Sequence, residues 1–209
     1  MSKPACRGLY VITDALLLPT NDRLLAAVEQ ALLGGARLVQ YRDKSGDAAR
    51  RLAQAQALNA LCQRHAVPLI INDDVELAAQ VGAAGVHVGK DDPAFATARA
   101  RLGENAIIGV SCYDRLDLAL AAARAGADYV AFGAFFPSPT KPTEIRAPLA
   151  LLQHARPLLN IPIVAIGGIT PDNGALLVEA GADALAVVSG VFGQPDLQAA
   201  ARRYAALFT

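Results

Sequence analysis

The chain has 209 residues, 54% of them hydrophobic, and its 19 basic and 19 acidic side chains leave no formal net charge. This length and composition suit one domain with a large core, and the balanced charge gives no reason to expect binding to nucleic acid or to an anionic membrane surface. No apolar run approaches the roughly 20 residues that a membrane span needs. The first apolar run begins by Gly8, which leaves no room for a secretory signal. The three scattered cysteines fit neither a metal site nor a disulfide framework, so we expect a cytoplasmic protein.

Short β-branched runs alternate with longer alanine- and leucine-rich segments of helical period. The runs predict strands at Leu9–Thr13, Leu38–Tyr41, Pro68–Asn72, Val86–Val88, Ile107–Ser111, Tyr129–Gly133, Ile163–Ile166 and Ala184–Val188. Helical patterns lie near residues 23–33, 48–64, 75–82, 93–102, 115–125, 147–157, 173–180 and 196–207. Most strand runs are apolar throughout, as in a parallel sheet covered on both faces. Because about eight such strands close a parallel barrel, we predict one (β/α)8 TIM barrel, a single domain over residues 1–209.

Gly-Ala pairs support this count because they precede every second predicted strand. They occur at Gly35-Ala36, Gly82-Ala83, Gly126-Ala127 and Gly181-Ala182, where glycine can adopt the left-handed conformation that ends a helix. An open, doubly wound sheet is the alternative fold. It normally carries a glycine-rich phosphate turn after its first strand, and the segment Thr13-Asp14-Ala15-Leu16 has none of these glycines.

Lysines are rare in this chain and gather where strands end. Only four of the 19 basic residues are lysines, and Lys44, Lys90 and Lys141 follow the second, fourth and sixth predicted strands. In a barrel of this kind the catalytic residues lie at these strand ends. Each lysine taken alone is more simply a solvated loop residue. A lysine ammonium is a compact charge that suits phosphate, so the joint placement of the three indicates an anionic substrate.

The segment Gln40–Lys44 follows the second strand. Side chains alternate along a strand, so Gln40, Arg42 and Lys44 are expected on one face, with Tyr41 and Asp43 on the other. An amide and two cations that converge on one point suit a diphosphate. A surface ladder of salt bridges is the alternative, but polar side chains directed into a barrel need compensating partners.

Carboxylates follow the third and fourth strands. Asp73 and Asp92 are candidate ligands for Mg²⁺, which proteins hold with one or two carboxylates together with substrate phosphate oxygens. Helix capping competes with this interpretation. Asp74 precedes a helical run and is assigned mainly to capping, whereas Asp92 precedes a proline and fits both roles equally.

The remaining strand ends carry hydroxyls and glycines. Ser111 has no histidine near it in sequence, so we interpret it as a hydroxyl donor to substrate rather than as an activated nucleophile. His87 lies within the fourth strand and is expected to be hydrogen bonded inside the barrel. The segment Ser138–Lys141 is a proline-stiffened arm that could clamp an anion or serve only as a structural loop. Gly168 and Ser189 follow the seventh and eighth strands, where this fold most often binds a monophosphate.

These residues together resemble the thiamine phosphate synthase family. The matching segments are residues 9–14, 40–44, 71–74, 85–89, 109–113, 126–133, 136–141 and 165–169, so the resemblance touches nearly every strand end. It implies a (β/α)8 barrel that joins 4-amino-2-methyl-5-hydroxymethylpyrimidine diphosphate to a thiazole phosphate, or to its carboxylated form. The products are thiamine phosphate and diphosphate, and the enzyme is a transferase.

The resemblance also assigns roles to individual positions. Lys141, Ser111, Arg42 and Lys44 are the expected catalytic residues, and Asp73 and Asp92 the expected ligands of one Mg²⁺ per subunit. The substrate-binding set is Gln40, Tyr41, Arg42, Asp43, Lys44, Asn72, Ser111, Ser138, Pro139, Thr140, Lys141, Gly168, Val188 and Ser189. Two departures stand out: Lys90 replaces a usual glutamine, and Ser138 a commoner threonine.

The implied reaction begins with departure of the diphosphate, aided by Mg²⁺ and by basic side chains, after which the thiazole nitrogen attacks the pyrimidine methylene. A related thiazole tautomerase needs only the monophosphate site and an acid or base. A non-catalytic binder of phosphorylated ligands is a third possibility. The cluster of convergent charges favours the transferase, and the oligomeric state stays open.

Overall fold

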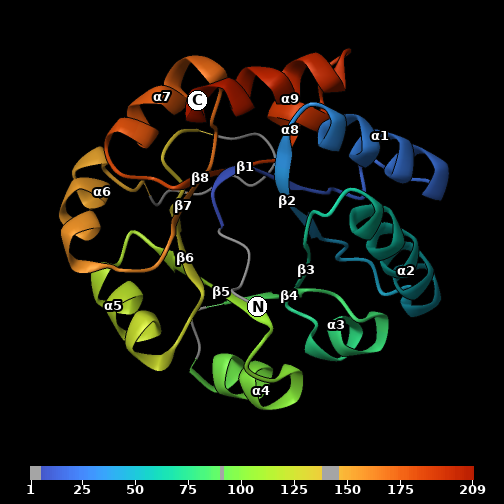
Figure 1. Cartoon of the computed structure of the whole chain (residues 1–209), viewed down its shortest axis with the longest axis horizontal. Helices are drawn as coiled ribbons and strands as arrows, with labels where there is room; N and C mark the ends of the chain where they lie inside the picture. Colours follow the sequence, from blue (N-terminus) through green and yellow to red (C-terminus); the bar gives the residue numbers. More distant parts are fainter. Residues whose placement is uncertain (1–5, 90–91, 138–145) are drawn as a thin grey trace.

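The structure is a computed structural model that describes residues 6–89, 92–137 and 146–209, with only the backbone described at residues 92 and 93. Eight parallel strands pair in chain order and close a barrel (Figure 1). They are β1 Gly8–Ile12, β2 Ala36–Tyr41, β3 Leu69–Asn72, β4 Gly85–Val88, β5 Ile107–Tyr113, β6 Tyr129–Gly133, β7 Ile163–Ile166 and β8 Ala184–Val187. The predicted (β/α)8 barrel is confirmed, and the open sheet is excluded because β1 pairs with β8.

A ring of helices surrounds the barrel (Figure 1). It comprises α1 Asn21–Leu33, α2 Ala48–Arg64, α3 Val75–Val81, α4 Asp92–Leu102, α5 Leu116–Ala125, α6 Leu149–Ala155, α7 Pro171–Glu179, α8 Ser189–Phe192 and α9 Leu197–Ala205, with short 3₁₀ turns at Arg156–Leu158 and Ala206–Phe208. The first and last long helices, α1 and α9, pack against each other and close the ring. None of the helices described is both long and apolar enough to cross a membrane.

The core has two layers because strand side chains alternate in direction. Leu9 and Val11 of β1 point outward and join the large cluster between the strands and the helices. Tyr10 and Ile12 of the same strand point inward and join a smaller cluster inside the barrel. The barrel is therefore a packed core, and its functional groups must reach substrate at the strand ends.

Local sequence signals set the helix boundaries. Side chains of Thr20, Asp47 and Asp74 accept hydrogen bonds from backbone N–H groups in the first turns of α1, α2 and α3. Glycines Gly82 and Gly126 end α3 and α5 in the left-handed conformation. The other two glycines of the Gly-Ala pairs also have positive φ angles, so the predicted helix-to-strand handovers are confirmed.

Most elements begin and end within about two residues of the sequence-based expectation, and the following differences concern their form. Strand β5 continues two residues beyond Ser111, through an irregularity in its pairing with β6 at which Tyr113 has a φ of 54°. The sixth helix is shorter than expected and continues as a 3₁₀ turn. Helix α8 was not predicted, because four residues are too few to show a helical period.

Candidate active site

The end of β2 is tied to the end of β1. The backbone N–H of Arg42 donates to the Thr13 hydroxyl over 2.9 Å, and one guanidinium nitrogen of Arg42 lies 3.8 Å from a carboxylate oxygen of Asp14. Asp14 is itself fixed, because its other oxygen accepts hydrogen bonds from the N–H groups of Leu16 and Leu17. Arg42 is thus held at the barrel mouth by an acidic partner that is already in place.

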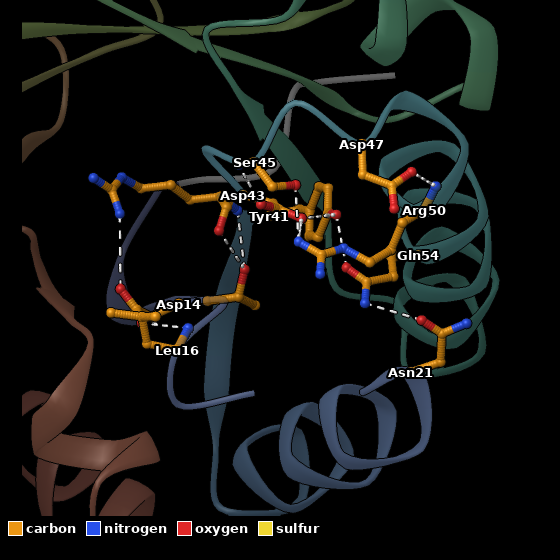
Figure 2. Close-up of polar contacts among 11 residues, drawn as sticks. Asp14, Leu16, Asn21, Tyr41, Asp43, Ser45, Asp47, Arg50 and Gln54 are labelled. Carbon is orange, nitrogen blue, oxygen red and sulfur yellow. Dashed lines mark hydrogen bonds and ion pairs between the residues drawn. The ribbon is translucent and has the colours of Figure 1, made fainter. Parts of the chain in front are cut away.

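Tyr41 and Asp43 face away from the barrel interior, toward α2 (Figure 2). The Tyr41 hydroxyl donates to Gln54 over 2.8 Å, and a carboxylate oxygen of Asp43 accepts from Arg50 at 2.8 Å. The other oxygen of Asp43 accepts from the N–H of Ser45 at 2.7 Å. Burial acts to raise the pKa of Asp43, but the hydrogen bonds from Ser45 and Arg50 outweigh it and lower that pKa below its ordinary value.

The resemblance counts Tyr41 and Asp43 among the substrate contacts, which stays a prediction, and the structure shows what their side chains contact. Their polar atoms are engaged with α2 and with their own loop, since strand alternation turns them outward. Their contribution is to hold the segment that carries Arg42 and Lys44. Lys44 is exposed in the loop after β2, as expected for a residue that meets a ligand from solvent.

The end of β3 presents an exposed carboxylate. Asp73 has a φ of 61°, and its side chain accepts a hydrogen bond from the Asn72 amide over 2.7 Å. Its backbone N–H donates to the carbonyl of His87 on β4. The neighbouring Asp74 caps α3 and pairs with Arg51 at 2.7 Å, so its assignment to capping is confirmed. Asp73 is therefore the carboxylate of this pair that faces solvent.

The barrel interior contains an unbroken chain of hydrogen bonds. The Gln40 amide donates to the Tyr10 hydroxyl at 2.7 Å, and the hydroxyls of Tyr10 and Tyr129 lie 2.9 Å apart. The Tyr129 hydroxyl lies 2.9 Å from Nδ1 of His87, whose Nε2 lies 2.8 Å from the Ser111 hydroxyl. The expectation of a hydrogen-bonded His87 inside the barrel is confirmed. The chain connects two residues, Gln40 and Ser111, that we expect to contact substrate.

The contact between His87 and Ser111 could not be read from the sequence, because it joins two strands. A serine beside a histidine raises the possibility of nucleophilic catalysis. Two observations oppose it: Nδ1 of His87 faces a tyrosine hydroxyl rather than a carboxylate, and burial lowers the pKa of His87 to about 4 against an opposing effect of Asp73. So weak a base does not activate a serine at neutral pH.

The loop after β7 lies close to the segment after β6. Gly168 has a φ of 61°, and a Cβ placed on it would lie 2.2 Å from the carbonyl oxygen of Pro137, so the position requires glycine. The Gly168 carbonyl accepts a hydrogen bond from Asn173 at the start of α7. Val188 and Ser189 are partly exposed at the start of α8, directly after β8. The elements expected to hold a monophosphate thus meet at one end of the barrel.

A family model described as thiamine monophosphate synthase matches residues 9–191. The chain belongs to the thiamine monophosphate synthase family. It is 59% identical to the thiamine-phosphate synthase of Thioalkalivibrio sulfidiphilus over 97% of this chain and 95% of that protein. The thiamine-phosphate synthase of Nitrosococcus oceani is 57% identical over 95% and 91%. A solved thiamine phosphate pyrophosphorylase from Pyrococcus furiosus superposes with a TM-score of 0.84 at 33% identity, covering 96% and 95% of the two chains.

Several residues expected to act in this family member fall outside the described structure. They are Lys90, Ser138, Pro139, Thr140 and Lys141, together with the side chain of Asp92. Within the described residues, no three histidine, cysteine, aspartate or glutamate side chains gather closely enough to hold a metal ion. The donor set nevertheless suits Mg²⁺, because Asp73 is an exposed carboxylate at the end of β3 and Asp92 is the first residue of α4.

Proposed function

We propose that this protein is a thiamine-phosphate synthase, a transferase that joins a pyrimidine diphosphate to a thiazole phosphate and releases diphosphate. The observation that carries the proposal is a placement: the residues expected to bind the pyrimidine diphosphate lie at the C-terminal ends of neighbouring strands β2 to β5. Gln40 and Arg42 come from β2 and the loop after it, Asp73 from the loop after β3, and Ser111 from β5. High identity to synthases over nearly the whole chain supports the same activity.

We assign the diphosphate to the mouth between β2 and β5. Arg42 and Lys44 supply positive charge, Asn72 an amide, and Ser111 a hydroxyl that donates to an anionic oxygen. Arg42 is oriented before substrate arrives, because Asp14 and Thr13 hold it. A cation that is already in place needs little rearrangement during the reaction. Its attraction for the leaving group grows as negative charge develops there.

We propose one Mg²⁺ per subunit, held by Asp73 and Asp92 and by diphosphate oxygens. When bound, the ion would neutralise negative charge on the leaving diphosphate. The Asp73 carboxylate is exposed, and among the described residues its side chain accepts a hydrogen bond from Asn72. The adjacent Asp74 is already occupied by its cap and by Arg51, so it is the poorer candidate ligand.

We assign the thiazole phosphate to the loops after β7 and β8. Gly168, Val188 and Ser189 would contact it, and Ser138, Pro139, Thr140 and Lys141 would complete the site from the arm after β6. Gly168 lies close to Pro137, the last described residue before that arm, which supports the assignment. Two anion sites at one barrel mouth suit an enzyme that joins two phosphorylated molecules.

The bond changes follow from this arrangement. The C–O bond between the pyrimidine methylene and the diphosphate breaks, and its electron pair leaves with the diphosphate oxygen. The amino-substituted ring stabilises the resulting cation, and the thiazole nitrogen then forms a C–N bond to the methylene carbon. No protein nucleophile is required, so the chain contributes positioning and charge stabilisation, with Lys141 proposed to meet the leaving oxygen.

The test is direct. The purified protein is incubated with both substrates and Mg²⁺, and the diphosphate and thiamine phosphate that form are measured. If the proposal holds, the two products appear in equal amounts. Omission of either substrate must abolish both products. Binding of one or both substrates without turnover would overturn the proposal. We further propose that residues 1–209 form one catalytic domain that works in the cytoplasm.

A further inference from the structure

The interior hydrogen-bond chain includes three residues that no substrate role explains. Tyr10, Tyr129 and His87 are buried, and they connect Gln40 on β2 to Ser111 on β5. The rings are closely packed: Tyr10 meets Tyr129 edge to face at 6.0 Å, and His87 stacks on Tyr129 at 5.5 Å. Polar side chains at such a depth need a reason, because each requires a partner.

A glycine makes room for this chain. A Cβ placed on Gly109 of β5 would lie 1.9 Å from Cζ of Tyr129, so a side chain at this position is incompatible with the observed ring. The barrel therefore has space made specifically for the tyrosine whose hydroxyl stands in the middle of the chain. This arrangement keeps Tyr129 in contact with both Tyr10 and His87.

Counting protons shows that the chain has a direction. Each hydroxyl carries one proton, and a neutral imidazole carries one N–H. Since the Gln40 amide donates to Tyr10, the Tyr10 proton goes to Tyr129, and the Tyr129 proton goes to Nδ1 of His87. His87 then carries its proton on Nε2 and donates to Ser111. The hydroxyl proton of Ser111 is left to donate to a ligand, and the carbonyl oxygen of Gln40 is left to accept from one.

The opposite direction is the one other arrangement that satisfies every group in the chain. If the Gln40 carbonyl accepted from Tyr10, each proton would reverse, and Ser111 would donate to His87 instead of to a ligand. If one part of the hydrogen-bond chain ran in one direction and the rest in the other, a buried hydroxyl or ring nitrogen would lack its hydrogen bond, which costs about 1–3 kcal/mol. The two ends of the chain are therefore coupled although they do not touch.

We propose that Tyr10, Tyr129 and His87 are positioning residues that couple the orientation of the Gln40 amide to that of the Ser111 hydroxyl. When Ser111 donates to an anionic oxygen, Gln40 presents its carbonyl oxygen. The preferred ligand then combines an anionic oxygen at Ser111 with an N–H donor at Gln40, and an aminopyrimidine diphosphate has both. This ligand assignment rests on the proposed function, whereas the ordering of the chain rests on its hydrogen bonds alone.

Nitrogen-15 NMR of the histidine rings tests the ordering, because the two neutral tautomers have distinct spectra. At pH 8, His87 of the unmodified protein is expected in the tautomer with its proton on Nε2. Gln40→Glu replaces the amide with a carboxylate of the same shape, which can accept from Tyr10 but cannot donate. The direction of the hydrogen bonds should then reverse, and the His87 proton should move to Nδ1, three hydrogen bonds and two intervening residues away from the substitution.

Two further variants keep the test decisive. Tyr10→Phe does not touch His87 but cuts the chain, so the His87 signal should become a mixture of tautomers, and kcat/KM should fall about fivefold, the effect of one hydrogen bond. This variant also serves if Gln40→Glu fails to fold. Gln30→Glu, on the exposed face of α1, makes the same change of charge outside the chain and should leave the His87 spectrum unchanged.

The outcomes separate the two proposals. A His87 tautomer that is the same in the unmodified protein, Gln40→Glu and Tyr10→Phe would overturn the coupling, whatever the activity. If Gln40→Glu reverses the tautomer of His87 but the unmodified protein has no synthase activity, the result would support the coupling and contradict the proposed function. Reversal in Gln40→Glu together with diphosphate release by the unmodified protein would support both.

Discussion

Nε2 of His87 lies 2.8 Å from the Ser111 hydroxyl, although 24 positions separate the two residues in the chain. Parallel pairing of β4 with β5 creates this contact, with His87 opposite Gly109, two positions before Ser111. The serine thus receives support from within the barrel and faces the mouth with its remaining capacity for hydrogen bonds. Its role as a donor to substrate is the first consequence that can be measured.

Ser111→Ala is expected to lower kcat/KM by about 10- to 100-fold, because a hydrogen bond to a charged oxygen is lost. The fold should survive, since alanine fits the space of serine. Steady-state kinetics and a thermal melt check both points. A variant with unchanged kcat/KM would remove Ser111 from the site.

Asp43→Ala should destabilise the protein by about 1–3 kcal/mol, because Arg50 and the Ser45 N–H lose their shared partner. The Asp43 side chain is 1% exposed, whereas that of Asp117, which pairs with Arg115, is 61% exposed. Asp117→Ala is thus a matched control that should alter stability little. Urea denaturation measures both, and equal effects would contradict the structural role of Asp43.

Gly168→Ala should destabilise the chain by about 1–3 kcal/mol and raise KM for the thiazole phosphate. The added methyl group would meet the Pro137 carbonyl in a left-handed backbone conformation. Gly46→Ala is the control, because a Cβ there meets no atom within 4 Å. If both variants are equally stable and bind the thiazole phosphate equally well, the close approach of the two loops is not needed.

The metal site predicts a contrast between two adjacent aspartates. Chelation should abolish activity and added Mg²⁺ should restore it. Asp73→Asn is expected to raise the Mg²⁺ concentration for half-maximal activity by at least about tenfold, as loss of a ligand does. Asp74→Asn keeps a capping side chain and should leave the Mg²⁺ requirement unchanged. A Mg²⁺ requirement that responds to Asp74 and not to Asp73 would contradict the assignment.

Burial of His87 predicts a stability that falls with acid in metal-free protein. The folded pKa of about 4 lies below the ordinary value of 6.5, so the unfolded chain binds the proton first. Stability is full above pH 6.5, declines as the pH falls toward 4, and loses about 3 kcal/mol from this group by then. Asp73 acts to raise the pKa of His87, against the larger effect of burial, and the Tyr129 hydroxyl is the buried partner of the imidazole Nδ1.

Urea denaturation across this pH range measures the slope. His87→Asn should show lower stability at pH 8 and a shallower decline between pH 6.5 and 4. The same decline in both proteins would assign the acid sensitivity to other groups. Exposed carboxylates contribute mainly below this window, because their ordinary pKa values lie near 4.

The sequence by itself determined the barrel, because eight short apolar runs between helical segments have one satisfactory parallel closure. It also placed the candidate residues at strand ends, and alternation correctly turned Gln40 inward. Alternation likewise turned the side chains of Tyr41 and Asp43 outward, and their place among the substrate contacts stays a prediction from the resemblance to the family. Their bonds to Gln54 and Arg50 show the side chains committed to α2.

Only the tertiary structure decided which residues of different strands meet. The hydrogen-bond chain from Gln40 through Tyr10, Tyr129 and His87 to Ser111 joins five strands across the barrel, and no local pattern encodes it. Strand pattern tells which face a side chain takes, whereas barrel closure and strand stagger set its height and its neighbours. Hydrogen bonds between strands depend on those heights and neighbours, so the polar chain inside the barrel can be recognised only in the closed structure.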